Sequence, residues 1–345
     1  MNFASDNVAG VSPEILQAVL DANAGRAMPY GADEISARVE KRFAEIFEHE
    51  VAVFLVATGT AANALALAAV TPPWGAVFCH EDAHIATDEC GAPEFFSAGA
   101  KLVTLSGDEG KLWPDALEKR LTGKGIVHNV QPAAISISQQ SEAGTHYRPS
   151  EVAVLGNLAR RHGVALHMDG ARFANAVVGL GCTPAAITWR AGVDVLSFGA
   201  TKNGALAAEA VVFFDRSKAA ELGFRRKRAG HLMSKMRFLA AQLEAYLSGE
   251  LWLRNARHAN AMAARLSGGL ARLPDVTLLY PADGNEIFVE LPDAAITALE
   301  AAGGKFYRWG AQPIIRLVTA FDTAVADVDA FLATAAQCLS SAGAQ

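Results

Sequence analysis

The chain has 345 residues, of which 51% are hydrophobic and 19% charged, a composition typical of a well-packed globular protein with little disorder. Its formal net charge of −6 argues against a broad attraction to nucleic-acid phosphates, so we expect no nucleic-acid partner. No apolar run reaches the roughly 18 to 20 residues of a membrane-spanning helix, and we expect no membrane partner.

Strand-like and helix-like patterns alternate along most of the chain. Apolar residues at helical spacing predict helices over 35–49 and 150–162. Short apolar segments predict seven strands, at 51–56, 76–80, 101–105, 133–138, 165–169, 194–198 and 210–214. Such alternation is typical of a mainly parallel sheet with helices on both faces.

The pattern changes near Phe238, after which helical spacing continues for many turns. Shorter strands are predicted to follow at 276–280, 286–291 and 313–318, with a helix at 296–303 between the last two. This order predicts a small α+β domain joined through a long helix. We therefore expect a large domain over 1–245 and a small C-terminal domain over 246–345.

The cysteines and the first residues of the chain indicate a cytoplasmic protein. Four cysteines are widely separated without CxxC spacing, which favours reduced thiols over disulfide bonds or a zinc site; they are Cys79, Cys90, Cys182 and Cys338. The opening segment MNFASDNVAGVSPEIL lacks the basic and apolar parts of a secretory signal.

A small-residue stretch, ATGTAANAL at 57–65, leads from a predicted strand into a helix. Backbone N–H groups at such a helix start, with the hydroxyls of Thr58 and Thr60, can bind a phosphate, and Gly59 allows close approach. The stretch is not a P-loop, and the chain has no GxGxxG after a strand. Taken alone, the stretch fits an ordinary strand-to-helix turn better than a phosphate site.

A second stretch, HMDGAR at 167–172, ends a predicted strand with an acid and an arginine. Asp169 could pair with a protonated ring nitrogen, and Arg172 could bind a carboxylate with both arms of its guanidinium. We expect no metal, because only His167 and Asp169 are nearby and no third ligand lies close in sequence. An ion pair at a strand end is the alternative interpretation.

Two further stretches carry reactive side chains. EDAHIATDE at 81–89 contains His84, Asp88 and Glu89, although a single histidine is more often structural than catalytic. VLSFGATKNG at 195–204 places Lys202 among small residues directly after a buried strand. That clearance suits a lysine that forms a Schiff base.

The order and separation of these four stretches resemble those of fold type I pyridoxal phosphate enzymes. Within that superfamily the chain resembles the low-specificity L-threonine aldolases over residues 2 to about 335. The matching segments are SDN at 5–7, YGAD at 30–33, TGTAAN at 58–63, DAHI at 82–85, MDGARFANA at 168–176, LSFGATKNG at 196–204 and IRLVT at 315–319. The resemblance implies an aspartate aminotransferase-like large α/β domain with a mostly parallel seven-stranded sheet, plus a small C-terminal α+β domain.

The resemblance also implies roles for individual residues. For the cofactor pyridoxal 5′-phosphate, Lys202 would form the Schiff base, Asp169 would pair with the pyridine nitrogen and His84 would stack on the ring. Gly59 and Thr60 would bind the phosphate, and Arg172 would lie beside the cofactor. The basic run at 225–228, with Arg226 and Arg228, would bring positive charge toward the phosphate from a neighbouring subunit.

For the substrate, Ser5, Arg172 and Arg316 would bind the α-carboxylate, and Asp88 and His128 would complete the pocket. The base would be His84, His128 or a water held by either, and these alternatives remain open. One segment, SISQQSEAGTHY at 136–147, departs from the acid–asparagine–threonine–histidine sequence of many such aldolases. The departure leaves the range of substrates at the β-carbon undefined.

The resulting expectation is a carbon–carbon lyase that cleaves L-threonine, L-allo-threonine and related β-hydroxy-α-amino acids to glycine and an aldehyde. The family further implies a homotetramer built as a dimer of dimers. The alternatives are another fold type I enzyme, namely a β-eliminating lyase, a serine hydroxymethyltransferase-like enzyme or an aminotransferase, or a non-catalytic homologue. Retention of Lys202, Asp169 and Arg172 in order argues against the last.

Overall fold

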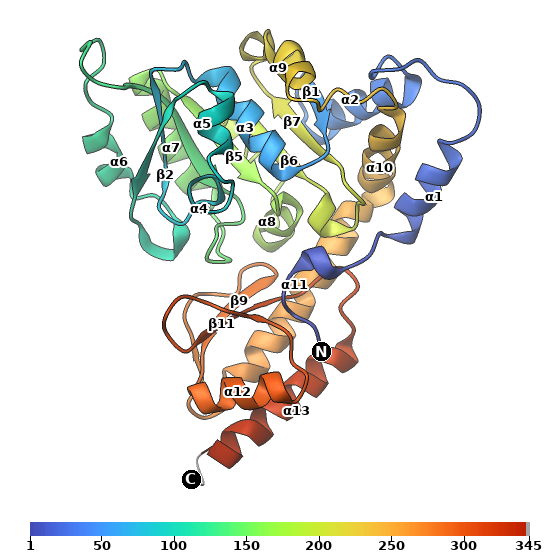
Figure 1. Ribbon diagram of the computed structural model, residues 1–345, viewed down its shortest axis with the longest axis vertical. Coiled ribbons are helices and arrows are strands. Elements are labelled where there is room, and N and C mark those ends of the chain that lie inside the picture. The colour runs from blue at the N-terminus through green and yellow to red at the C-terminus, as the bar shows by residue number, and fades with distance from the viewer. Residues whose placement is uncertain (343–345) are drawn as a thin grey trace.

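A seven-stranded sheet forms the centre of the larger part of the molecule (Figure 1). The structure, a computed structural model, describes residues 1–342. All seven strands predicted for this part are present: β1 (Ala52–Val56), β2 (Gly75–His80), β3 (Lys101–Leu105), β4 (Gln131–Ser138), β5 (Ala165–Gly170), β6 (Val195–Gly199) and β7 (Glu209–Phe213). The predicted large α/β domain is thereby confirmed.

The sheet is mostly parallel, with the strand order β1-β7-β6-β5-β4-β2-β3. Only β7 runs antiparallel to its two neighbours, β1 and β6. The central strand β5 pairs in register with both sides, so that Asp169 lies opposite Ser138 of β4 and Ser197 of β6. Three polar side chains therefore meet at the carboxyl edge of the sheet, where open parallel sheets bind ligands.

Helices cover both faces because neighbouring residues of each strand point to opposite sides. Val195 of β6 joins a core with α3 (Gly59–Val70) and α9 (Leu222–Arg228), and α5 (Ala92–Phe96) packs on α3. Leu196 and Phe198 join the opposite, larger core with α2 (Glu34–Phe47), α7 (Pro149–His162), α8 (Phe173–Leu180) and α10 (Arg237–Leu247). The remaining helices of this part are α1 (Pro13–Asp21), α4 (His84–Thr87) and α6 (Pro114–Arg120).

The long helical stretch expected after Phe238 is two helices. α10 ends at Leu247, and α11 (Leu251–Leu270) starts after a turn in which Gly249 and Glu250 have positive φ values of 54° and 57°. This left-handed backbone cannot continue an α-helix, so the single-helix expectation is wrong at this point. Figure 1 shows α11 as the connection between the two parts of the molecule.

The smaller part carries a four-stranded antiparallel sheet, confirming the predicted α+β architecture. Its strands, in the order β10-β11-β9-β8, are β8 (Thr277–Leu278), β9 (Glu286–Glu290), β10 (Tyr307–Arg308) and β11 (Ile314–Val318). They pack with α11, α12 (Asp293–Ala301) and α13 (Val325–Ala342). Among residues 1–342, no helix is both long enough and apolar enough to cross a membrane.

The first residues of the chain pack on this smaller part. Phe3 is fully buried in its core, its N–H donates to the carbonyl of Lys305 at 2.8 Å, and its carbonyl accepts from the N–H of Val318 at 2.8 Å. The N-terminal segment thus leaves the smaller core and enters the larger part, which places Ser5 and Asp6 between the two. The expected division at 245/246 remains a prediction, but residue 3 belongs to the C-terminal core.

Candidate active site

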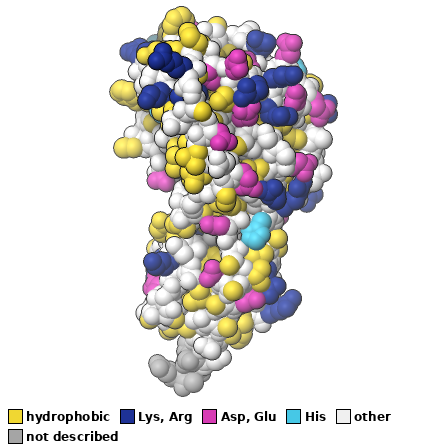
Figure 2. Space-filling model, turned by 90° about the vertical axis from the view of Figure 1, so that its right-hand side faces the viewer, with side chains coloured by type: hydrophobic (Ala, Val, Ile, Leu, Met, Phe, Trp, Pro, Cys, Tyr) yellow, Lys and Arg dark blue, Asp and Glu magenta, His cyan; other side chains and the backbone are white. Residues whose placement is uncertain are grey.

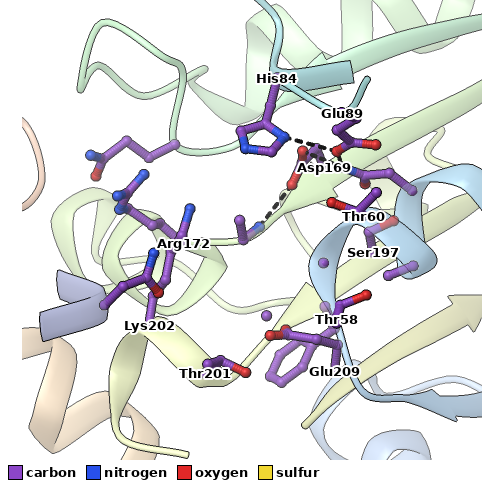
Figure 3. A pocket seen from close by; sticks show the side chains of 18 of the residues that line it. Thr58, Thr60, His84, Glu89, Asp169, Arg172, Ser197, Thr201, Lys202 and Glu209 are labelled. Carbon is purple, nitrogen blue, oxygen red and sulfur yellow. Dashed lines mark hydrogen bonds and ion pairs between the residues drawn. The ribbon is translucent and has the colours of Figure 1, made fainter. Parts of the chain in front are cut away.

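A cavity of about 230 Å³ opens at the carboxyl edge of the large sheet (Figure 3). A wider outer pocket of about 500 Å³ shares Asn7, His84 and Glu142 with it, so the two form one continuous site. The inner cavity is lined by Thr58, Gly59, Thr60, Asn63, Glu89, Gln140, Asp169, Arg172, Ser197, Lys202 and Glu209, among others. The outer pocket adds Ser5, Asp82, Asp88, Tyr307, Trp309 and Arg316.

The start of α3 presents an anion-binding surface to the inner cavity. The Thr58 hydroxyl caps this helix by accepting the N–H of Ala61 at 3.2 Å. The N–H groups of Gly59 and Thr60 precede the first bonds within the helix and are available to a ligand. A side chain added at Gly59 would meet nothing within 4 Å, so the space beside this turn is open. A phosphate group fits there on charge and shape.

Asp169 is fixed at the base of the cavity. Its Oδ2 accepts a hydrogen bond from the Asn63 side chain at 2.7 Å, and its Oδ1 accepts the N–H of Ala171 at 2.9 Å. Behind it, His167 is buried between the hydroxyls of Ser136 at 2.8 Å and Ser197 at 2.9 Å. Burial lowers the pKa of His167 to about 4, so this histidine is neutral and Asp169 has no imidazolium beside it.

His84 faces the cavity and is oriented by a buried carboxylate (Figure 3). Its Nδ1 lies 2.9 Å from Oε1 of Glu89, and that same oxygen accepts a hydrogen bond from Asn63 at 2.8 Å. The bond to Glu89 raises the pKa of His84, an effect that its partial burial opposes. Its Nε2 lies 3.6 Å from the exposed carboxylate of Asp88 in the outer pocket. Asn63 therefore links His84, through Glu89, to Asp169.

Lys202 enters the cavity from a short turn that follows β6. Among the residues that the structure describes, its amine has no ion pair or side-chain hydrogen bond. The turn is held by Glu209, whose Oε2 accepts the N–H of Ala200 at 2.9 Å. It ends at Gly204 (φ 111°), where a Cβ would lie 2.3 Å from the Ser12 hydroxyl. The backbone is thus fixed while the amine remains available for covalent chemistry.

Arg172 is held by two carboxylates. Its Nε and Nη2 donate to Asp6 at 2.7 and 3.0 Å, and its Nη1 lies 3.0 Å from Glu286. Burial alone would raise the pKa of Asp6, but the charges of Arg172 and Lys202 keep it below its usual value. A guanidinium has five N–H groups, so two remain for a ligand in the cavity that Arg172 lines. The arginine is available to a substrate but strongly oriented.

Arg316 is the cation of the outer pocket. Its guanidinium lies over the rings of Tyr307 and Trp309, at 5.4 and 5.3 Å from their centres. Its ionic contact is long, 3.7 Å to Oε1 of Glu286, its Nη2 donates to the carbonyl of Ala4 at 3.4 Å, and its Nε has no hydrogen-bond partner. Ser5 lines the same pocket. Arg316 therefore has more unused binding capacity for a carboxylate than Arg172.

Two predicted site residues lie elsewhere in the chain. His128 is exposed in the loop before β4, at the amino end of a strand whose carboxyl end faces the cavity. Eight residues of strand separate these ends by roughly 26 Å, so His128 cannot act in the cavity of its own chain. Arg228 is exposed on α9 and lines neither pocket, and Arg226 donates instead to the carbonyl of Leu55 at 3.3 Å.

Several site residues received no role in the sequence analysis. Asp6 and Asn63 lie inside the matched segments SDN and TGTAAN, so their positions could have been noticed. Gln140 and Glu142 lie two and four residues after the carboxyl end of the parallel strand β4, and that position is itself a signal. Glu286 gave no such signal, because it lies in the smaller part and reaches Arg172 only through the fold.

The residues present fit pyridoxal phosphate. A free amine, a buried carboxylate for a ring nitrogen, and an open helix start for a phosphate surround one cavity. No group of three His, Cys, Asp or Glu side chains within residues 1–342 is arranged to hold a metal ion.

Comparisons with known proteins agree with this geometry. Residues 2–294 match the family model of the beta-eliminating lyases. A low-specificity L-threonine aldolase from Pseudomonas aeruginosa is 44% identical over 93% of both chains. Among solved structures, a threonine aldolase from Leishmania major superposes with a TM-score of 0.92 at 28% identity, covering 98% of this chain and 99% of that one. An aspartate aminotransferase from Thermus thermophilus shares the fold alone, with a TM-score of 0.71 at 16% identity, covering 96% and 89%.

Proposed function

The chain belongs to the beta-eliminating lyase family, among its low-specificity L-threonine aldolases, and we propose that it is a pyridoxal phosphate-dependent aldehyde-lyase. Its substrates are L-threonine, L-allo-threonine and related β-hydroxy-α-amino acids, which it cleaves to glycine and an aldehyde. The observation that carries this proposal is the convergence of Lys202, Asp169 and the start of α3 on one cavity.

The inner cavity would hold the cofactor. Lys202 would supply the amine for covalent attachment, the N–H groups of Gly59 and Thr60 would bind the phosphate, and Asp169 would keep the pyridine nitrogen protonated. When bound, the cofactor accepts the electron pair that remains at Cα when the Cα–Cβ bond breaks. The hydrogen bonds from Asn63 and Ala171 hold the Asp169 carboxylate in place for this role.

The substrate would enter from the outer pocket with its α-carboxylate on Arg316 and Ser5. Arg172 lines the adjoining inner cavity, and its two remaining N–H groups would bind the same carboxylate from that side. Fixing the carboxylate at two cations sets the rotation about Cα and thereby which bond is broken. Because Arg172 is already bound by Asp6 and Glu286, it orients the substrate with little rearrangement of its own.

His84 is suited to stack on the cofactor ring and to assist proton movement. The Glu89 carboxylate accepts a hydrogen bond from the Nδ1–H of His84, which leaves Nε2 as the nitrogen that can take or give a proton on the outer side. The carboxylate of Asp88 at 3.6 Å from Nε2 can hold a water there. His128, excluded from its own cavity, has no part in this proposal.

An absorbance spectrum followed by an activity assay tests the proposal. We expect a yellow protein whose long-wavelength band is lost on borohydride reduction and is absent in Lys202→Ala, together with acetaldehyde from L-threonine. A yellow protein that makes no acetaldehyde would redirect the assignment to other reactions of this fold. Dependence on a keto acid would then identify an aminotransferase, dependence on folate a hydroxymethyltransferase, and release of ammonia a β-eliminating lyase. A colourless protein that takes up no cofactor would refute the proposal and point to a non-catalytic homologue.

We further propose that the protein acts in the cytoplasm as a homotetramer built from two dimers. Figure 2 shows hydrophobic patches among charged side chains on the face that carries α1 and the loop after it. Leu16, Leu20 and Met28 there expose 50%, 61% and 66% of their surface, and apolar groups exposed together favour association. Light scattering coupled to gel filtration would measure the mass, and a monomer at micromolar concentration would contradict this part.

A further inference from the structure

Glu142 is a carboxyl group at the junction of the two cavities, with no role assigned so far. It lies in the loop after β4, four residues beyond Ser138, and lines both the inner cavity and the outer pocket, as do His84 and Asn7. Within residues 1–342, its side chain makes no hydrogen bond and no ion pair. A group in this position meets the part of a substrate that lies between the cofactor and the outer pocket.

The other carboxyl groups of the inner cavity are all occupied. Glu89 accepts from Asn63 and lies at hydrogen-bond distance from His84, Asp169 accepts from Asn63 and the backbone, and Glu209 accepts the N–H of Ala200. These contacts give each of the three a fixed acceptor role. Of the carboxyl groups that line this cavity, Glu142 alone has both oxygens available to a ligand.

The loop that carries Glu142 is firmly held. The Gln139 side chain donates to the carbonyl of Tyr147 at 2.8 Å and accepts its N–H at 2.9 Å, closing the loop at its base. Nearer the tip, the N–H of Ser141 donates to the carbonyl of Thr145 at 2.9 Å, and their hydroxyls lie 2.8 Å apart. A loop fixed in this way presents its one unpaired carboxyl at a defined place, as a proton-transfer group requires.

Charged groups from both parts of the molecule surround this carboxyl. Burial, the largest effect, raises the pKa of Glu142 to about 7, and the carboxylates of Asp169 and Glu286 raise it further, against the opposing charges of Lys202 and Arg172. His84 and Arg316 face the same outer pocket, with Asp82 and Asp88 beside them. A carboxyl that titrates near neutral pH is a much better base than an ordinary glutamate.

We propose that Glu142 is the catalytic base that takes the β-hydroxyl proton of the substrate. This inference rests on the proposed aldolase function. The O–H bond breaks and its proton moves to an Oε of Glu142, while the former O–H pair becomes the second bond of the aldehyde carbonyl. The Cα–Cβ bond breaks and its pair remains at Cα, where a proton is later added to give glycine. The proton on Glu142 leaves through the outer pocket to solvent.

The test separates the two halves of the reaction with Glu142→Gln. Cleavage of L-threonine needs a base at the β-hydroxyl, whereas exchange of the α-hydrogen of glycine in D₂O does not. We expect kcat/KM for cleavage to fall about 10²- to 10⁴-fold, with glycine exchange followed by NMR within a few-fold of the wild-type rate. Glu142→Asp, which keeps the carboxyl, should recover part of the cleavage. Equal losses in both reactions, or unchanged cleavage, would overturn the inference.

A second readout does not depend on activity. Infrared difference spectra between the wild type and Glu142→Gln should show one carboxyl that titrates near pH 7, and a midpoint below pH 5 would overturn the inference. Glu290→Gln is the matched control, because Glu290 is exposed on β9 and lines neither cavity. The wild type must first be shown to cleave L-threonine, because a wild type without this activity would refute the proposed function itself. If the wild type is active and Glu142→Gln is equally active, only the role of Glu142 is refuted.

Discussion

The buried ion pair between Asp6 and Arg172 offers a sharp test of what holds the N-terminal segment at the site. Two hydrogen bonds, of 2.7 and 3.0 Å, join the side chains, which are only 1% and 9% exposed. Asp6→Asn preserves the shape but removes the charge. It leaves the guanidinium of Arg172 with one carboxylate, that of Glu286 at 3.0 Å.

Removing one partner of a buried ion pair costs about 3 to 5 kcal/mol, because the other charge remains buried without compensation. Since Glu286 still neutralises Arg172, we expect the lower end, a loss of about 3 kcal/mol in the free energy of unfolding. Urea unfolding at pH 7 and a fixed protein concentration measures it. Asp329→Asn is the control: Arg265 binds Asp329 with the same two-bond geometry, 2.7 and 2.9 Å, but both side chains are 49% exposed.

Solvent screens the exposed pair, so the Asp329 variant should show no measurable loss. The pKa of Asp6 lies below its usual value in the folded protein, so its contribution is present above the pKa of the unfolded state. It is lost as the pH falls through the lower, folded value. The difference between wild type and Asp6→Asn should therefore shrink in acid. If Asp6→Asn cost no more than Asp329→Asn at pH 7, burial would not be what makes this pair important.

Three other variants test the pocket. Arg316→Ala should raise KM for L-threonine about 10- to 100-fold, because the variant loses one charge-assisted hydrogen bond to the substrate carboxylate. A decrease in kcat with an unchanged KM would contradict a binding role. Burial raises the pKa of Glu209 to about 7 from 4.5, so this group should contribute a loss of about 3 kcal/mol of stability between about pH 4.5 and 7.5. Glu209→Gln should reduce the pH dependence in urea titrations by that amount, and an unchanged slope would contradict the contribution. Glu89→Gln should lower the pKa of His84, measured from its imidazole NMR signals; an unchanged value would show that Glu89 does not set it.

The strands and the cofactor-facing residues could be predicted because local patterns determine them. A buried parallel strand reads as a short apolar run, and residues that directly follow it reach the ligand edge. Asp169 lies at the carboxyl end of β5 and Lys202 in the turn after β6, and both line the cavity. The break between α10 and α11 could not be read in the same way, because apolar spacing continues through it and only Gly249 marks the turn.

The same rule explains the misplacement of His128. A residue that precedes a parallel strand lies at the opposite edge of the sheet from one that follows it, and His128 precedes β4 while Gln140 and Glu142 follow it. The choice of His128 rested on resemblance, and strand direction would have corrected it. The partners of Arg172 could not be predicted from the sequence by any such rule. Asp6 and Glu286 come from opposite ends of the chain, and no local pattern brings them together.

These long-range contacts join the substrate site to the packing of the smaller part. Glu286 and Arg316 lie on the neighbouring strands β9 and β11 of the small sheet. In this pair of strands Arg316 lies opposite Phe288, and Leu317 lies opposite Ile287. Asn285 donates to both Asp6 and the carbonyl of Thr319. A shift of the small sheet would therefore move Arg316 and, at the same time, weaken the contacts of Asp6 and Glu286 with Arg172. Because both arginines bind the same carboxylate in the proposed reaction, substrate binding should stabilise the present arrangement of the two parts, and a ligand without a carboxylate should not.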